Sequence, residues 1–488
     1  MGCLGGASAE HKLASMWAPD RKCTFSTSFS GIGAPEQAVH HLQCYLRSKL
    51  PSSPTSVKCI GAVEWNSFSR AELIAGPHPP SHLWVNIIEF VSPAIRAGVQ
   101  AKLDAGQFTF KQLWHQLSQP SAIRTSAHCV LCAGDCHVSA AQLHIAGTPC
   151  VDFSTQPGAK RLGTMGGACL PFVVWLALRA RVQESIIVHE NVRGFNPQTL
   201  VAVLGAWYVC MSVLLELNCH GFPVRRTRRL TLLVHRRLLR TAIAPIIRWS
   251  GAWVEQFKRS CLISFHKFLL ATTAEIDSEL QWVSTRSHRG GPPPVSSLPQ
   301  FKSNSDVRAS KFVASLNVSE LLRLRLYRRK WPSLLSFPRV FMLNQEAATC
   351  PCVSGTRTMH TQTKSQDLAL IDSLNRFIVP NEYLLMQGFP VYPCTKLHSE
   401  LCAFDQALAT RDARHTIEQS GNSMPVPLMS LTVLYAFLIV LDPSNYAATD
   451  ALPPSVRTSV VATVDTDRLF RTELRAALAP PAKRRRRS

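Results

Sequence analysis

The chain has 488 residues, of which 46% are hydrophobic and 17% are charged. This composition excludes a wholly disordered protein, and the length allows two to four domains with a large buried core. Lysine and arginine number 53 against 31 aspartates and glutamates, which gives a formal charge of +22. Such a balance favours a polyanionic partner, nucleic acid first and an acidic membrane surface second.

Targeting and membrane signals are weak in this sequence. The first thirty residues lack the apolar run of a signal peptide, and Gly6 stands where a myristoylation signal needs Ser or Thr. The longest apolar stretch, residues 431–441, is too short to span a bilayer and predicts a core helix. The sixteen cysteines show no framework spacing and no secretory signal is evident, so we interpret them as reduced thiols of an intracellular protein. We expect no membrane partner.

Short β-rich segments alternate with helix-like segments from residue 22 to about residue 237. We expect strands at residues 23–29, 57–63 and 186–189, with another strand that ends at 144–147. Helices are expected at residues 35–49, 66–75 and 170–182. This alternation predicts an α/β domain on a parallel sheet whose two faces are covered.

The remaining segments differ in composition. Residues 1–21 form an N-terminal extension. Residues 238–375 lack the strand–helix rhythm and include a Gly-Gly-Pro-Pro-Pro run, which predicts a second, irregular domain. Regular pattern returns at residues 376–442, and we expect residues 443–488 to be a disordered basic tail. The final cluster of this tail, Lys483 to Arg487, fits nuclear import, with a nonspecific charge run as the alternative.

Two motifs after the first two predicted strands suit a nucleotide-like ligand. The glycines of Phe29-Ser30-Gly31-Ile32-Gly33 would let backbone approach a ligand at a helix N-terminus, or form only a tight turn. Glu64 ends the second strand, where nucleotide-binding α/β folds place a carboxylate for ribose hydroxyls, and Trp65 could stack on adenine. A surface carboxylate beside a core tryptophan is the alternative.

Two further segments carry candidate catalytic groups. Cys150, in Gly147-Thr148-Pro149-Cys150, follows a predicted strand near a helix N-terminus, where the helix dipole favours a thiolate. The alternative is a buried, inert cysteine. Glu190 ends the strand at 186–189, and a partly desolvated carboxyl there can donate a proton or a hydrogen bond. A structural carboxylate is the alternative.

Four of these segments resemble, in their order and spacing, motifs I, II, IV and VI of the cytosine-C5 DNA methyltransferase family. They are Phe-Ser-Gly-Ile-Gly, Val-Glu-Trp-Asn, Gly-Thr-Pro-Cys and His-Glu-Asn-Val. Residues 221–228, 381–390 and 421–425 resemble motifs VIII, IX and X. The resemblance implies a Rossmann-like S-adenosylmethionine-dependent methyltransferase sheet. Residues 22–237 and 376–442 would form this catalytic domain, and residues 238–375 a smaller, irregular target-recognition domain.

The resemblance also implies a DNA (cytosine-5-)-methyltransferase of the nucleus, with S-adenosylmethionine as cofactor and double-stranded DNA as substrate. Cys150 would attack C6 of a flipped cytosine, and Glu190 would hold or protonate N3. Arg226 and Arg228 would contact the base or its backbone and stabilise the intermediate. The residues assigned to the cofactor are Phe29, Gly31, Gly33, Glu64, Trp65, Asn86, Asn422 and Ser423.

Three residues depart from the family pattern. Val224 replaces a glutamine, Asn86 replaces an aspartate that accepts from adenine, and Thr27 replaces an aspartate ahead of the glycine loop. Two alternatives therefore stay open. One is a tRNA cytosine-C5 methyltransferase, although the Cys-Phe-Thr signature of that branch is not found. The other is a nucleic-acid-binding relic of the family that lacks turnover.

Two clusters outside these motifs suggest further contacts. Basic residues interleaved with aromatics in the recognition region suit phosphate contact and base stacking, or form only an exposed helix face with packing aromatics. They are Arg323, Arg325, Arg328, Arg329 and Lys330, with Tyr327 and Trp331. A second cluster combines cysteine and histidine, residue types that bind zinc, although short clusters of this kind often bind no metal. Its members are Cys129, Cys132, Cys136 and His137. We assign no metal ligand to the active site.

Overall fold

The computed structural model describes residues 22–49, 56–105, 109–150, 169–238, 255, 257–261, 263–287, 311–312, 314–331, 339–345, 358–360, 369–392 and 413–437. The predicted N-terminal extension and the predicted basic tail lie outside these ranges. The described residues divide into two compact units. The first comprises those within 22–215, 227–257 and 429–437, and the second those within 216–226 and 258–428.

The first unit is built on a nine-stranded sheet in the order β5-β4-β3-β2-β1-β6-β7-β9-β8. Its five central strands run parallel: β3 (Leu83–Trp84), β2 (Ser56–Val63), β1 (Lys22–Ser28), β6 (Leu143–Gly147) and β7 (Ile186–Val192). Antiparallel pairing adds β4 (Ser126–Cys129) and β5 (Gly134–His137) at one edge, and β9 (Thr227–His235) followed by β8 (Tyr208–Glu216) at the other. The predicted α/β fold with a parallel central sheet is confirmed, whereas the antiparallel edges were not predicted.

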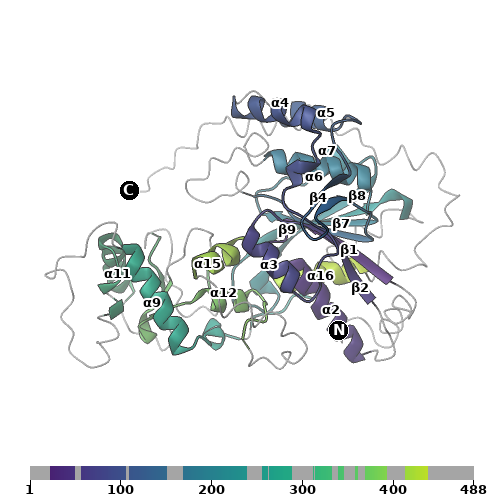
Figure 1. The fold of residues 1–488 in the computed structure, drawn as a ribbon. Helices are drawn as coiled ribbons and strands as arrows, with labels where there is room; N and C mark the ends of the chain where they lie inside the picture. Colours follow the sequence, from purple (N-terminus) through teal and green to yellow (C-terminus); the bar gives the residue numbers. More distant parts are fainter. Residues whose placement is uncertain are drawn as a thin grey trace, which may run out of the picture. The chain divides into compact units, whose positions relative to one another are not determined.

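Helices cover both faces of this sheet (Figure 1). α2 (Ala34–Lys49) and α3 (Ser67–Ala75) link strands that step in one direction, and α6 (Cys169–Val182) links strands that step in the other. Right-handed crossovers therefore place α2 and α3 on one face and α6 on the opposite face. Three helical segments share the face of α6: η1 (Ile87–Phe90), α5 (Phe110–Leu117) and α7 (Gln198–Leu204). α4 (Pro93–Asp104) precedes α5 in the chain.

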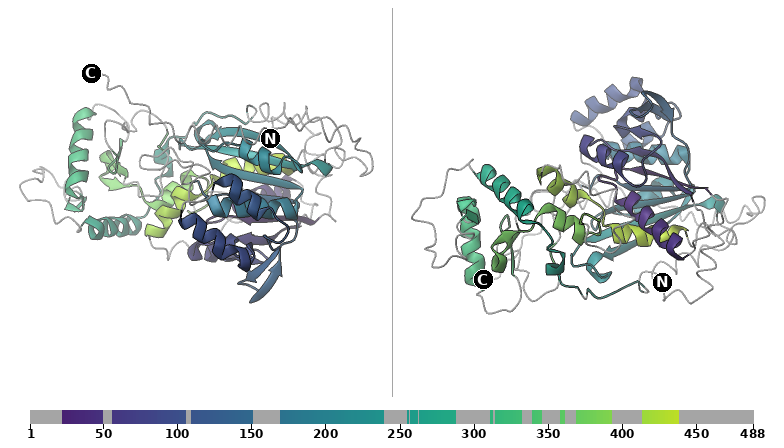
Figure 2. Two further views of the ribbon diagram at one scale, coloured as in Figure 1. Left: turned by 90° about the horizontal axis from the view of Figure 1, so that it is seen from above. Right: turned by 60° about the horizontal axis from the view of Figure 1, so that its bottom comes forward.

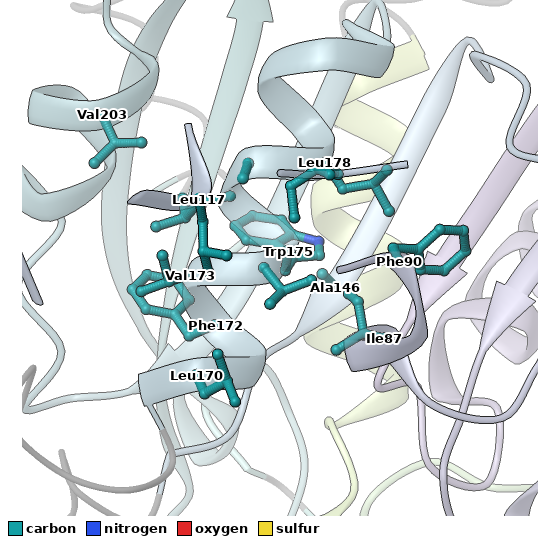
Figure 3. Close-up of a cluster of buried hydrophobic side chains, with 14 of the residues drawn as sticks. Ile87, Phe90, Leu117, Ala146, Leu170, Phe172, Val173, Trp175, Leu178 and Val203 are labelled. Carbon is teal, nitrogen blue, oxygen red and sulfur yellow. The ribbon is translucent and has the colours of Figure 1, made fainter. Parts of the chain in front are cut away.

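An extensive apolar core of this unit lies around α6 (Figure 3). Almost every side chain of α6 is buried, as expected of a helix that is apolar on all sides. Trp175 donates its indole N–H to Nε2 of His144 at 3.0 Å, and Nδ1 of His144 lies 2.8 Å from Oγ of Ser26. Because an indole only donates, Nε2 accepts and Nδ1 carries the proton of a neutral ring. The indole of Trp175 and both ring nitrogens of His144 are thus paired.

The apolar stretch predicted as a core helix begins inside α16 (Val426–Tyr435), and Leu431, Val433 and Leu434 are buried there. Figure 1 and the right panel of Figure 2 show α16 beside α2. No helix within the described ranges is both long and apolar enough to cross a bilayer.

The second unit combines short helices with a small antiparallel sheet. Its helices are η6 (Phe265–Phe268), α9 (Thr273–Ser287), α11 (Val318–Lys330), α12 (Pro380–Met386) and α15 (Ala413–Asn422). The sheet pairs β10 (Val340–Met342), β11 (Ala369–Ile371) and β12 (Arg376–Phe377). β12 lies beyond the predicted boundary at residue 375, yet it pairs with β11, and Arg376 forms an ion pair with Glu382 of α12 at 2.7 Å. The described residues within 376–428 accordingly belong to this unit.

The basic helix α11 contributes to the core of the second unit. Tyr327 is fully buried and stacks on Phe341, with ring centroids 5.0 Å apart. Arg328 forms an ion pair with Asp372 at 2.9 Å, and Arg323 donates to the carbonyl of Leu343 at 2.9 Å. Tyr327 therefore packs in the core, which agrees with the alternative of packing aromatics and not with base stacking for this residue. The exposed members of the basic cluster are Arg325, Arg329 and Lys330.

Candidate active site

The carboxyl ends of the five parallel strands carry the predicted site residues of the first unit. The glycine loop follows β1, Glu64 follows β2 and Asn86 follows β3. Cys150 lies three residues past β6, and Glu190 lies near the end of β7. Since β2 and β6 flank β1 on opposite sides, the chain changes direction at β1. In open α/β sheets, ligands bind outside the carboxyl ends of the strands at such a point.

The loop after β1 turns sharply into α2. Phe29, Gly31 and Gly33 have positive φ angles of 56°, 58° and 87°. The amide of Phe29 donates to the carbonyl of Val63 at 2.9 Å, which ties the loop to the end of β2. A Cβ atom on Gly33 would lie 3.3 Å from Cδ2 of Leu73, so a larger residue there would strain both the backbone and its packing.

The Glu64 carboxylate joins the loops that follow β1 and β2. Its Oε2 accepts from the amide of Gly31 and its Oε1 from the amide of Asn66, each at 3.0 Å. Burial raises the pKa of Glu64, and these amide hydrogen bonds lower it in part. Each carboxylate oxygen keeps a further lone pair, so the group can also accept hydroxyl hydrogens of a ligand.

Trp65 and Asn86 lie after neighbouring strands but differ in exposure and bonding. The Trp65 side chain is 72% exposed, while its backbone carbonyl accepts from Arg70 at 2.6 Å. Asn66, the next residue, caps α3 by accepting from the amide of Ser69. Asn86 caps η1 by accepting from the amide of Ile88 at 3.0 Å. The structure thus fixes the backbone at both positions and leaves the indole exposed.

The segment that carries Cys150 is anchored to β7. The register of β6 with β7 pairs Gly147 with Glu190. The Asn191 amide donates to the carbonyl of Thr148 at 3.3 Å, and the hydroxyl of Thr148 lies 2.7 Å from Nε2 of His189. Burial lowers the pKa of His189 to about 3, which keeps that ring neutral. Cys150 itself is half-buried, and residues 151–154 of its motif lie outside the described residues.

The structure brings Glu190 and Arg228 together. Nε of Arg228 lies 2.8 Å from Oε1 of Glu190, and the side chains are 12% and 10% exposed. Nη1 of Arg228 donates to the carbonyl of Thr227 at 2.9 Å, which holds the guanidinium in place. β9 runs antiparallel to β7 and pairs Arg228 with Val192. One cation and one anion thus share the edge of the sheet that also carries Cys150.

Three predicted site residues belong to the second unit. Arg226 is fully buried, and its Nη2 donates to the carbonyls of Gly421 and Ser423 at 2.9 and 2.5 Å. The hydroxyl of Ser423 donates to Oε1 of Gln387 at 3.1 Å, and Asn422 is exposed. Arg226 therefore holds the backbone of the turn at 421–423, a role that the sequence did not indicate.

Two of the departures from the family pattern lie in apolar or enclosed surroundings. Val224 is buried and its backbone bridges that of Met359. Thr27 donates to Oε1 of Glu36 at 2.7 Å, and burial raises the pKa of Glu36 to about 7. Sequence reasoning missed Glu36. Its position in the first turn of the helix that follows the glycine loop was the available signal.

The predicted cluster of cysteines is present, but with His82 beside it in place of His137. The ligand atoms of His82, Cys129, Cys132 and Cys136 all lie within 4.8 Å of one another. His137 is exposed and adjacent to Cys136 in β5, and successive residues of a strand point to opposite faces. The expectation for His137 is therefore wrong. His82 was missed because it lies 47 residues before Cys129 in the chain.

No protein-family model matches the chain, and no curated protein matches it. Several solved structures resemble it. The Dnmt2 methyltransferase of S. pombe is 12% identical, with 87% of this chain and 100% of that chain covered at a TM-score of 0.44. A proposed DNA modification methyltransferase encoded within an E. coli prophage is 14% identical in sequence. The match covers 86% of this chain and 99% of that chain, with a TM-score of 0.44. The Entamoeba histolytica methyltransferase EhMeth is 13% identical in sequence. The match covers 86% of this chain and 98% of that chain, with a TM-score of 0.41. At such identities, activity has to be inferred from the residues of this chain.

Proposed function

We propose that this chain transfers a methyl group from S-adenosylmethionine to C5 of cytosine in DNA, with Cys150 as the nucleophile. The observation that carries the proposal is the Glu190–Arg228 pair at 2.8 Å. The register that pairs Gly147 with Glu190 brings the segment of Cys150 to the same edge of the sheet. A thiol, a carboxylate and a guanidinium at one strand edge suit covalent attack on an electron-poor ring.

The loops after β1 and β2 fit the cofactor. Glu64 has lone pairs for ribose hydroxyls, Trp65 offers an exposed aromatic face, and the positive φ of Gly31 and Gly33 turns the chain sharply from β1 into the N-terminus of α2. Bound there, the cofactor would supply an electrophilic methyl group. We propose further contacts from Phe29, Asn86, Asn422 and Ser423.

The catalytic roles follow from the chemistry of cytosine. The Cys150 thiolate would bond to C6 of an extruded base, which makes C5 nucleophilic. Glu190 in its protonated form would donate its proton to N3, where negative charge collects on attack, and Arg228 would orient Glu190 and neutralise charge on the ring. After methyl transfer to C5, the C5 proton would pass to solvent water, Cys150 would leave C6 as a thiolate, and the N3 proton would return to Glu190. We assign Arg226 to positioning of the turn at 421–423.

DNA is the proposed substrate, and the nucleus is the proposed location. A formal charge of +22 suits a polyanion, and Arg325, Arg329 and Lys330 are exposed on α11. These charges would contact phosphates of either nucleic acid. The preference for DNA rests on the missing Cys-Phe-Thr signature of the tRNA-methylating branch.

Labelled methyl transfer to mixed-sequence DNA and to bulk tRNA tests this proposal. We expect label in DNA with the parent, none in tRNA, and a loss of at least about 1000-fold with Cys150→Ala, the scale for removal of a covalent nucleophile. Label in tRNA alone would establish the RNA activity instead. Equal label in DNA with parent and variant would exclude Cys150 as the nucleophile, and nucleic-acid binding without transfer would identify a relic.

A further inference from the structure

We propose that His82, Cys129, Cys132 and Cys136 bind one zinc ion that fixes the β4–β5 hairpin to the sheet at β3. The site stands apart from the proposed methyl transfer and depends on no residue of that reaction. Three cysteines and one histidine form a common ligand set of structural zinc.

The distances fit a tetrahedral ion. Zinc binds sulfur at about 2.3 Å and imidazole nitrogen at about 2.0 Å, which separates adjacent S and N ligands by about 3.5 Å. Nδ1 of His82 lies 3.4 Å from Sγ of Cys132 and 3.9 Å from Sγ of Cys129. All four ligand atoms lie within 4.8 Å of one another, although no metal contributed to this arrangement. Small side-chain adjustments would complete the coordination sphere.

The backbone around Cys129 is suited to a thiolate. Cys129 is fully buried, and its sulfur accepts from the amide of Leu83 at 3.3 Å. Hydrogen bonds of this kind orient a metal ligand and disperse its charge. The amide of Val130 donates to the carbonyl of Leu83 at 2.9 Å, so Leu83 bonds both to the Cys129 sulfur and to the backbone of the next residue. The rings of Trp84 and His82 are neighbours, with centroids 5.8 Å apart.

The turn of the hairpin brings the other cysteines to this sulfur. Cys129 ends β4, Cys132 lies in the turn and Cys136 lies in β5. Ala133 has a φ of 53°, a conformation that a non-glycine residue adopts only where its surroundings impose it. Cys132 and Cys136 thereby reach the face on which Cys129 lies.

The local architecture indicates a structural rather than a catalytic ion. Four protein ligands would fill the tetrahedral shell and leave no position for water or substrate. β3 has two residues, and β4 and β5 have four each, so this edge has little pairing of its own. A zinc ion would cross-link His82, just before β3, to a hairpin that begins 44 positions later at Ser126. Its binding free energy would then stabilise the fold.

Metal analysis of the full-length chain, purified without chelator, tests the site. We expect about one zinc per chain in the parent and in the matched control His137→Ala, since four protein ligands suffice for one ion. His82→Ala and Cys132→Ser should each lower zinc content or affinity by at least about tenfold. A parent without zinc after incubation with Zn²⁺, or a His82→Ala variant with parental zinc affinity, would overturn the proposal.

Cobalt substitution keeps the test decisive if the variants do not fold. The parent reconstituted with Co²⁺ should show the visible ligand-field bands of a tetrahedral ion together with thiolate-to-cobalt charge transfer. Chelation should remove these bands and lower the melting temperature of the parent and of His137→Ala alike. An octahedral spectrum, or a disulfide between two of these cysteines in protein purified in the presence of a reductant, would contradict a zinc site.

Discussion

The side chains of Arg228 and Glu190 form an ion pair of 2.8 Å at the carboxyl edge of the central sheet, with 12% and 10% of their surfaces exposed. The partners come from β9 and β7, which lie side by side but are separated in sequence by α7 and β8. The ion pair holds the Glu190 carboxyl group in place beside the segment that carries Cys150. The proposed function rests on this arrangement.

Removing one partner should cost more stability than removing both. Arg228→Met leaves the Glu190 charge without its cation, at a cost on the order of 3 kcal/mol of unfolding free energy. We expect the double variant Arg228→Met with Glu190→Gln to recover at least about 1 kcal/mol of that loss, because contacting residues are coupled. Urea unfolding of the parent, the two single variants and the double variant measures the coupling free energy between the two side chains. Strictly additive losses would show that the pair does not interact in solution.

Thr148→Val should slow methyl transfer without removing any reacting group. The Thr148 hydroxyl lies 2.7 Å from His189 and accepts from Asn191, two contacts that position the segment leading to Cys150. A displacement of about 1 Å can cost up to about 100-fold in rate, so we expect kcat to fall by about 10- to 100-fold with little change in KM. Thr285→Val, on the exposed face of α9, is the control. Unchanged kcat for Thr148→Val would exclude this positioning role.

Trp65→Ala should weaken cofactor binding and leave stability nearly intact. The side chain is 72% exposed, so its removal costs little packing. An aromatic contact contributes about 1 kcal/mol, and the dissociation constant for S-adenosylmethionine should rise by about tenfold or less. Calorimetric titration measures this, and Trp65→Phe should retain most of the affinity. Equal affinity of Trp65→Ala and parent would place the adenine elsewhere.

Glu36 should make the protein less stable at alkaline than at acidic pH. Its pKa is raised from 4.5 to about 7, chiefly by burial, so the folded state binds the proton more tightly than the unfolded state. The associated stability is fully present below pH 4.5 and is lost as the pH rises through about 7. The loss amounts to about 3 kcal/mol from the shift in pKa.

Urea unfolding at several pH values between 4.5 and 8.5 tests this dependence. Glu36→Gln should flatten the decline, because a neutral amide has no proton to lose, and Glu418→Gln at an exposed position should not. A decline in Glu36→Gln as steep as in the parent would assign the pH dependence to other groups.

The parallel core was predictable because its signals are local. The strand expected at 57–63 is observed as Ser56–Val63, and the helix expected at 170–182 as Cys169–Val182. Continuous apolar runs bounded by polar residues mark buried strands and helices whatever surrounds them. The candidate residues that follow these strands in sequence lie at the carboxyl edge of the sheet for the same reason, and their roles stay predictions.

Features that depend on long-range pairing were not predictable. His82 joins Cys129 only because β3 and β4 pair, and nothing near His82 in sequence indicates a metal ligand. Tyr327 sits among arginines in sequence, yet the helical repeat turns it into the core while Arg325 and Arg329 face outward. Arg226 finds its carbonyl acceptors 195 and 197 residues away.

Covalent trapping on DNA that contains 5-fluorocytosine tests the central claim most directly. Fluorine at C5 cannot leave as a proton does, so the bond between enzyme and C6 persists once a methyl group has been added. We expect the parent with S-adenosylmethionine to form a denaturation-resistant complex, and Cys150→Ser to form none while still binding DNA. A complex that forms equally with Cys150→Ser, or methyl transfer by a parent that never forms one, would contradict the role of Cys150.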